Sequence, residues 1–184
     1  MARTFRAKPA YTGFAALLAV SLALAADDAD TVKHVRNIAG GSTNLLTTQT
    51  FSAGVRSCSS RIDVVANFLT KGTQSSALIF LPEREPDNIM VSISAEVQAE
   101  GFPRAYASAT FSPNTAIGCS AMYETVQYWA ESCNVVAARV FKGATPSGPL
   151  GSEIGILTIG PLARVFMLRP SSSSCVTIKK EVLK

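Results

Sequence analysis

The stretch VSISAEVQ, residues 91–98, decides the fold class of this chain. In it Val91, Ile93, Ala95 and Val97 alternate with polar side chains. A period of two places every second side chain on the same side of a strand, so the pattern predicts a strand with one buried and one solvated face. A sheet with one wet face is typically antiparallel.

Residues 104–111 are expected to return beside this strand, with Ala105, Ala107, Ala109 and Phe111 on one face. The row of alanines leaves room for a bulky neighbour, which we expect to be a closely packed helix. An alternative use of that room is the floor of a ligand cavity. Further strands are predicted at residues 77–81, 154–159, 162–168 and 176–183, with a hairpin between the second and third of these.

Two helices are predicted to cover the sheet. Residues 59–71 contain Ile62, Val65 and Ala66 on one side at the 3.6-residue period. A longer helix is expected over residues 118–142, where apolar residues recur at spacings of three and four. These residues are Cys119, Met122, Val126, Trp129, Cys133, Val136 or Ala137, and Val140. The predicted fold is therefore α+β, a largely antiparallel sheet packed on one face by two helices and linked by disulfides.

The two predicted helices begin with similar sequences. Residues 58–68 and 119–129 share the order Cys-Ser, an apolar or aromatic residue, an acid, a valine and a final aromatic residue. Each is followed by about three strand-like segments, which suggests a tandem α-β-β-β duplication with approximate two-fold symmetry. The alternative is a chance resemblance between two amphipathic helices.

The N-terminus predicts a cleaved signal peptide over residues 1–25. Arg3, Arg6 and Lys8 form a positive start, and residues 13–25 form an uncharged apolar run that ends in Ala-Leu-Ala. A helix that crosses a membrane needs about 20 apolar residues, so this run is too short to be an anchor. We expect no membrane span after cleavage.

The remaining chain is expected to contain one domain in an oxidising compartment. Residues 26–50 predict a polar, partly irregular segment, and residues 51–184 a single α+β domain. The style of the signal favours a bacterial source, so the expected location is the periplasm or the extracellular space.

Four cysteines, Cys58, Cys119, Cys133 and Cys175, follow the signal and indicate two disulfides. Metal and redox sites usually hold closely spaced cysteine pairs, which this chain lacks, so neither a metal nor a redox role is expected. On one continuous helix Cys119 and Cys133 would lie about 21 Å apart, beyond the reach of a disulfide. The preferred pairing is Cys58–Cys119 with Cys133–Cys175, and Cys58–Cys133 with Cys119–Cys175 stays open. If residue 135 instead begins a strand, Cys119–Cys133 is open as well.

The charge and the motifs of the chain exclude several classes of function. The formal charge of +4 comes from 17 basic and 13 acidic residues. Three of the basic residues belong to the predicted signal, so the mature chain lacks the cationic surplus of a nucleic-acid binder. The only histidine, His34, lies in the polar segment, which disfavours a Ser-His-Asp triad. No nucleotide-binding glycine motif occurs, and no cofactor is expected.

The remaining candidates are two carboxylates and one surface. Asp63 and Glu124 hold equivalent places in the two similar segments and could serve a carboxylate-dependent hydrolase. The simpler interpretation is that each acid stabilises the start of a helix. Tyr128, Lys179 and Lys180 are candidates for a partner surface, since an exposed tyrosine is typical of interfaces.

The leading hypothesis is a non-enzymatic binding or accessory protein of the bacterial envelope or extracellular space. It would be stabilised by disulfides and would act through contacts with another envelope or extracellular protein. A hydrolase that uses Asp63 and Glu124 is the first alternative, and a carrier of small ligands is the second.

Overall fold

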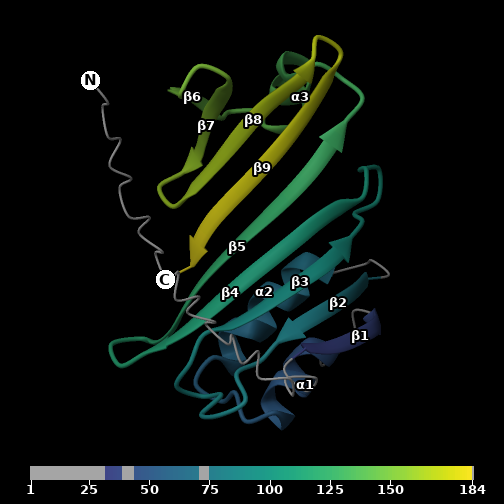
Figure 1. The fold of residues 1–184 in the computed structure, drawn as a ribbon. Helices are drawn as coiled ribbons and strands as arrows, with labels where there is room; N and C mark the ends of the chain where they lie inside the picture. Colours follow the sequence, from purple (N-terminus) through teal and green to yellow (C-terminus); the bar gives the residue numbers. More distant parts are fainter. Residues whose placement is uncertain (1–31, 39–43, 71–74, 184) are drawn as a thin grey trace, which may run out of the picture.

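The computed structural model describes residues 32–38, 44–70 and 75–183. Its nine strands form one antiparallel sheet in the order β1-β2-β3-β4-β5-β9-β8-β7-β6 (Figure 1). The strands are β1 (Val32–Ile38), β2 (Ser75–Phe80), β3 (Val91–Val97), β4 (Ala105–Asn114), β5 (Gly118–Trp129), β6 (Thr145–Leu150), β7 (Ile154–Gly160), β8 (Ala163–Ser171) and β9 (Ser174–Leu183). The helices are α1 (Leu45–Ser52), α2 (Ser59–Thr70) and α3 (Cys133–Val140). The predicted large antiparallel sheet is confirmed.

The strand at residues 91–98 and its returning partner form as predicted. In β3 and β4, Ile93 lies opposite Ala109 and Ala95 opposite Ala107, all of them buried. The helix expected from residue 59 is also present as α2, which packs on β4 and β5 and buries Ile62. These elements share one core because their apolar periods, two in the strands and 3.6 in the helix, meet on one side of the sheet.

α2 and α3 lie on the same face of the sheet. Strand register shows this, because side chains of residues paired across strands point to the same side. Tyr123 in β5 belongs to the core under α2, whereas Trp129, three alternations further along β5, belongs to the core under α3. α3 packs on β8 and β9, so each half of the sheet carries its own helix and its own core.

The single helix expected over residues 118–142 is wrong. The first part is strand β5, and only Cys133–Val140 is helical. In β5, Cys119 and Tyr123 face the helices, while Met122 and Val126 face the other way. When both faces of a strand carry apolar residues, some of these residues fall at spacings of three and four, as in an amphipathic helix. This spacing caused the wrong prediction. The aromatic and β-branched residues of this segment favour the strand.

The expected repeat is therefore wrong in its alignment, since residues 58–68 form α2 whereas residues 119–129 form β5. The structure repeats differently. A helix followed by four antiparallel strands occurs twice, as α2-β2-β3-β4-β5 and as α3-β6-β7-β8-β9. The two units meet through their last strands, β5 and β9, so the order of strands is the same when it is followed outward from this seam in either direction (Figure 1).

The segment before residue 51 contains more regular structure than was expected. Within it lie β1, which pairs with β2, and most of α1. Asn44 begins α1: its side-chain oxygen accepts from the N–H of Leu46 at 2.9 Å, and its amide donates to Thr70 Oγ1 at 2.9 Å. α1 is thus capped and tied to the end of α2 by one buried residue. His34 belongs to β1, and the predicted signal lies outside the described residues.

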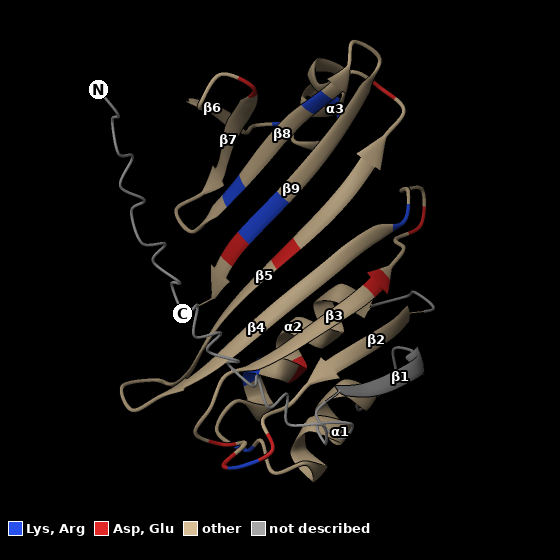
Figure 2. Cartoon of the chain, viewed as in Figure 1, with Lys and Arg blue, Asp and Glu red and all other residues tan. Residues whose placement is uncertain are grey.

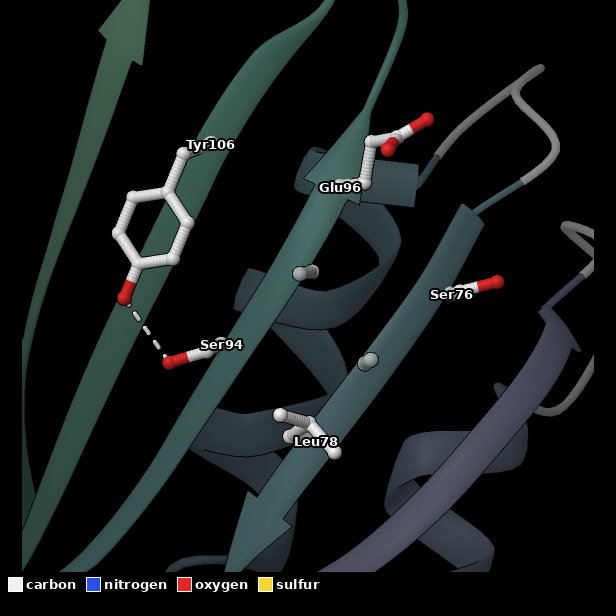
Figure 3. Close-up of a pocket in the computed structure, with 7 residues that line it drawn as sticks. Ser76, Leu78, Ser94, Glu96 and Tyr106 are labelled. Carbon is white, nitrogen blue, oxygen red and sulfur yellow. Dashed lines mark hydrogen bonds between the residues drawn. The ribbon is translucent and has the colours of Figure 1, made fainter.

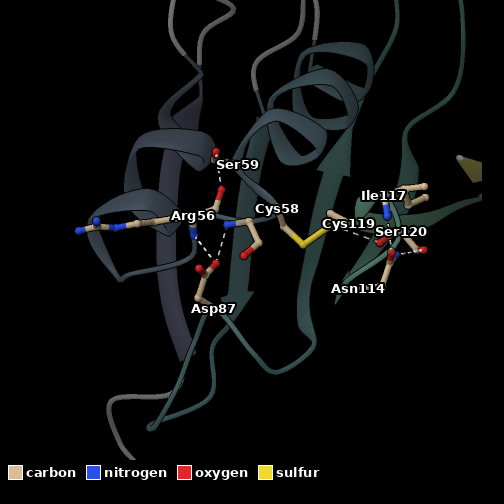
Figure 4. The surroundings of a disulfide bond; sticks show 9 residues. Arg56, Cys58, Ser59, Asp87, Asn114, Ile117, Cys119 and Ser120 are labelled. Carbon is tan, nitrogen blue, oxygen red and sulfur yellow. Dashed lines mark hydrogen bonds between the residues drawn. A yellow bond between two sulfur atoms is a disulfide. The ribbon is translucent and has the colours of Figure 1, made fainter.

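The two disulfides follow the preferred pairing, Cys58–Cys119 and Cys133–Cys175. Each joins the beginning of a unit's helix to the beginning of that unit's last strand. Figure 4 shows the Cys58–Cys119 bond. Cys119 lies near the start of β5, and Cys133 begins α3 just after the other end of that strand. Because β5 spans roughly 40 Å at about 3.3 Å per residue, the two cysteines cannot pair. The exclusion of Cys119–Cys133 was therefore correct, but it was argued from a continuous helix that does not form.

The loop around the first disulfide is fixed by one carboxylate. Asp87 Oδ1 accepts from the backbone N–H groups of Arg56 at 2.7 Å and Ser57 at 2.5 Å (Figure 4). These residues precede Cys58, so the contact orients the chain where it enters α2. None of the described helices is long and apolar enough to cross a membrane.

β6 forms one edge of the sheet and was not predicted. Its sequence, TPSGPL, contains two prolines, and every residue of it is exposed. The pairing of β6 with β7 shifts between Pro146 and Pro149, around Gly148, whose φ is +86°. Proline removes a ladder donor, so sequence rules place such a segment in a loop unless it lies at an edge.

Candidate functional site

We call the face of the sheet opposite α2 and α3 the outer face. On its C-terminal half, cross-strand register places Tyr128 beside Val176, Val126 beside Ile178, and Phe166 beside Ile178. These side chains belong to a set, the apolar patch, that spans β5, β9, β8, β7 and β6 and in which no member is buried. The apolar patch comprises Val126, Tyr128, Leu150, Ile154, Ile156, Phe166, Leu168, Val176 and Ile178.

The N-terminal half of the outer face is polar instead. Its strands carry Ser92, Ser94, Ser108, Thr110, Ser112 and Ser120 there. A shallow hollow of about 240 Å³ lies over β2, β3 and β4, lined by Leu78, Ser94 and Tyr106, whose hydroxyl is 2.9 Å from Ser94 Oγ (Figure 3). The two halves of one continuous face therefore differ: the N-terminal half is mostly polar, although Phe80 and Tyr106 are exposed there, and the C-terminal half carries the larger set of apolar side chains.

Near the seam, charged side chains form a row across the outer face. Glu124 of β5 lies opposite Lys180 of β9, and their Oε2 and Nζ atoms are 2.9 Å apart. Arg164 of β8 lies next in the row, opposite Lys180, and donates to the carbonyl oxygens of Gly160 and Ala163. Figure 2 shows these charges on β5, β9 and β8, with long uncharged stretches of the same strands beyond them.

On the helix-bearing face the same seam holds a hydrogen-bonded cluster. Tyr123 donates to Glu181 at 2.5 Å, and Lys179 donates to the Tyr123 hydroxyl at 2.7 Å and forms an ion pair with Glu181 at 3.0 Å. Lys179 Nζ also lies 5.4 Å from the ring centre of Phe68. Burial, and then the hydrogen bond and charge of Glu181, raise the pKa of Tyr123 far above its ordinary value. Tyr123 therefore stays protonated and acts as a donor that joins β5 to β9.

The same contacts lower the pKa of Glu181. Burial acts to raise its pKa, but hydrogen bonds from Tyr123 and Lys179, together with the charge of Lys179, outweigh burial and lower it. A carboxyl whose pKa falls on folding stabilises the fold above its ordinary pKa, and this contribution disappears as the pH falls through the lower, folded-state value.

We therefore expect Glu181→Gln to destabilise the chain at pH 7 and to have progressively less effect below about pH 4. Urea unfolding of both proteins between pH 7 and pH 2.5 measures the difference. Glu153→Gln, at an exposed turn, is the control and should show no such pH dependence. A destabilisation by Glu181→Gln that stays constant with pH would contradict the assignment.

The structure does not bring the two candidate carboxylates together. Asp63 lies on α2, accepts a hydrogen bond from Thr47 Oγ1 at 3.0 Å, and lines a hollow of about 380 Å³ between α1 and α2. Glu124 lies in a strand and not in a helix, on the outer face, paired with Lys180. The sheet separates the two groups, so they have no common substrate position.

The candidate partner residues divide between the two faces. Tyr128 is 57% exposed and belongs to the apolar patch, and Lys180 lies in the adjoining charged row. Lys179 points to the opposite face, because neighbouring residues of a strand alternate. Of the alanines of β4 proposed as a cavity floor, Ala107 and Ala109 are buried beneath α2. Ala105 is partly exposed and lines a hollow of about 230 Å³ beside Phe68 and Phe102.

The rest of the apolar patch was missed by the sequence analysis, although a signal was present. The hairpin from residue 154 to residue 168 has apolar side chains at successive positions, as in Val165, Phe166, Met167 and Leu168. Such a run indicates a strand that is apolar on both faces. Here one face packs against α3, and in the described residues no helix covers the other.

The described residues contain no group of three or more His, Cys, Asp or Glu side chains that could hold a metal ion. Comparison with protein-family models, with curated proteins and with solved structures finds no match to this chain.

Proposed function

We propose that this chain is an exported, disulfide-stabilised binding protein of the bacterial envelope or extracellular space, without catalytic activity of its own. It acts by docking an envelope or extracellular protein on the apolar patch. One observation carries the proposal: a set of large apolar side chains, including Tyr128, Phe166 and Ile178, lies together on a sheet face opposite the helices.

The amino-acid composition of the outer face supports the proposal that the apolar patch is covered by a docked protein. The outer face of a single-layer sheet is normally polar, as it is in β3 and β4 of this chain. Contiguous exposed apolar patches above a few hundred Å² mark interaction sites in soluble proteins. The apolar patch is spread over five neighbouring strands of one sheet face. Such a broad surface suits a protein better than a small ligand, since small ligands bind in concave sites.

The disulfides support the export part of the proposal. Both bonds are buried, at Cys58 and Cys119 in the first core and at Cys133 and Cys175 in the second. Disulfides of this structural kind persist in oxidising compartments and are rare in the cytosol.

Photo-cross-linking from the apolar patch tests the proposed function. With benzoyl-phenylalanine in place of Tyr128, irradiation of the cells that naturally produce the chain should give a covalent adduct with one defined protein. Its mass, determined after purification, identifies the partner. An adduct is expected because the side chain at residue 128 is exposed in the chain alone. A protein docked on the apolar patch would bring its own C–H bonds into contact with the probe there.

The matched control carries the same probe at Val135 on α3, which is 48% exposed and on the opposite face. The control should give no adduct or a diffuse set of weak ones. If position 128 and position 135 label alike, or if position 128 labels nothing, the proposed function is wrong.

A further inference from the structure

We propose that the helix-bearing face holds a second site, which binds a neutral amphipathic small molecule. The polar head of this molecule both donates and accepts hydrogen bonds, as an amide does. The site is the cleft over the C-terminal end of β9, between α2 and the turn that joins β7 to β8, and we call it the seam cleft. It lies on the opposite face of the sheet from the apolar patch, so it does not depend on the proposed function.

The seam cleft consists of two adjoining hollows. The first, of about 360 Å³, lies against α2, where Val64 and Phe68 line it. The second, of about 500 Å³, lies against the turn at residues 159–163. Sites for small ligands typically measure about 300–1,000 Å³, and each hollow reaches that range. The residues that line both hollows are Lys179, Glu181 and Leu183.

The cleft is open because each helix covers its own core. Cys175, at the beginning of β9, belongs to the core under α3, whereas Glu181, three alternations later on the same face, does not. On the other side, α2 packs on β4 and β5. Ala163 lies directly opposite Glu181 in β8, and its short side chain leaves the floor of the cleft low. The uncovered part of the sheet is therefore concave, with apolar walls and a polar centre.

The polar centre offers one hydrogen-bond donor and one acceptor side by side. Glu181 Oε2 accepts from Tyr123 and is paired with Lys179 Nζ, which also donates to the Tyr123 hydroxyl. An ammonium group has three protons and a carboxylate has two oxygens. Among the described residues, the third proton of Lys179 and Oε1 of Glu181 are therefore left without a partner. The raised pKa of Tyr123 and the lowered pKa of Glu181 keep the cluster in this state at neutral pH.

This centre favours a neutral head group. The charges of Lys179 and Glu181 cancel, so an anionic head would meet the carboxylate, a cationic head would meet the ammonium, and either would lose hydration. An amide satisfies both groups, because its carbonyl oxygen accepts from Lys179 while its N–H donates to Glu181 Oε1. The two side chains are only 24% and 30% exposed, so such bonds are stronger than on an open surface. The apolar walls would hold the body of the molecule.

Three probes with one apolar body and different heads test the site: phenylpropanamide, phenylpropanoate and phenylpropylammonium. Each is titrated into the oxidised, isotope-labelled chain at pH 7 and followed by nuclear magnetic resonance. The amide should bind with a dissociation constant of about 5 mM or lower, as expected for a fragment of this size. The two charged probes should bind at least about 10-fold more weakly. The shift changes should centre on Phe68, Tyr123 and Glu181 and leave Tyr128 and Phe166 unchanged.

Single substitutions at the polar centre should change the preferred head. Lys179→Met leaves the carboxylate alone, so the cationic probe should gain at least about 10-fold relative to the amide. Glu181→Gln leaves the ammonium alone, so the anionic probe should gain by a similar factor. Circular dichroism at pH 7 shows whether each variant is folded.

A matched pair of phenylalanines tests the apolar wall. Phe68 and Phe51 are both exposed and both lie on helices, but only Phe68 lines the seam cleft. Phe68→Ala should weaken binding of the amide by at least about 5-fold, because it removes apolar contact area. Phe51→Ala should bind the amide like the wild type. This pair decides the question even if a substitution at the polar centre prevents folding.

Several outcomes would overturn the site. They are the absence of saturable shift changes, shift changes centred on the apolar patch, and equal binding of the three probes. A preference that folded Lys179→Met and Glu181→Gln leave unaltered, or equal binding by Phe68→Ala and Phe51→Ala, would overturn it as well. None of these results bears on cross-linking from position 128, which tests the proposed function on the other face.

Discussion

Replacement of Cys133 and Cys175 by alanine is expected to lower the free energy of unfolding by roughly 4 kcal/mol. The bond closes a loop with a sequence separation of 42 residues, and the loss of loop-closure entropy in the unfolded chain gives about this magnitude. Such a loss is a large part of the 5–15 kcal/mol that stabilises a typical domain. Urea unfolding of the oxidised mature chain, followed through the fluorescence of its single tryptophan, measures it.

The effect should be concentrated in the C-terminal unit. α3 has only eight residues, too few to be stable alone, and both cysteines are buried in its small core. Hydrogen exchange should therefore show lost protection in α3 and β8 before β2 and β3. Removal of the Cys58–Cys119 bond is the matched comparison and should expose the N-terminal unit first. Uniform loss of protection in both variants, or a change below about 1 kcal/mol, would contradict this assignment.

Trp129→Ala is expected to destabilise the chain by about 3–5 kcal/mol, the range for truncating a large buried aromatic side chain. Trp129 is 2% exposed and lies at the centre of the C-terminal core. Its ring meets Phe102 edge to face at 6.1 Å and lies 5.5 Å from the guanidinium of Arg139, so it also joins the β3–β4 turn and α3 to the sheet. Chemical denaturation followed by far-ultraviolet circular dichroism measures the loss.

A double-mutant cycle separates the hydrogen bond of Trp129 from its packing. Nε1 of Trp129 donates to Thr177 Oγ1 at 2.9 Å in a buried environment. Trp129→Phe leaves the buried Thr177 hydroxyl without this donor, so Thr177→Val should cost less in the Phe background than in the wild type, by about 1 kcal/mol. Strictly additive effects would show that the hydrogen bond contributes no coupling energy.

The predicted core hairpin and α2 were correct because local pattern and tertiary packing agree there. In β3 and β4 only one face is apolar, so the period of two has one interpretation. In α2 the apolar period ends near Thr70, and the helix of the structure ends at that residue too. Where a segment has one apolar face, the sequence is sufficient to define it.

The failures share a cause: apolar residues on both faces. In β5, Met122 and Val126 on the outer face complete a helical spacing with Cys119 and Trp129 on the inner one. The period alone cannot separate these cases, because apolar residues on both faces of a strand fit the helical spacing as well. The same side chains that misled the secondary-structure prediction therefore make up or adjoin the candidate site.

The candidate site itself was predicted only at Tyr128 and Lys180. Its other members come from strands far apart in sequence, such as Ile154 in β7 and Val176 in β9, and their proximity depends on strand order. A single sequence does not specify that order. Asp63 and Glu124 were grouped by a resemblance between a helix and a strand, and register places them on opposite sides of the sheet.

The edge strand β6 has a consequence for how copies of this chain can assemble. Pro146 and Pro149 lack an amide donor, and the register of the ladder shifts around Gly148. These features disfavour the addition of another polypeptide as a further strand, which is the route that leads open sheets into endless fibrils. The margin formed by β6 is therefore guarded against such growth, while the opposite margin of the described sheet is formed by β1.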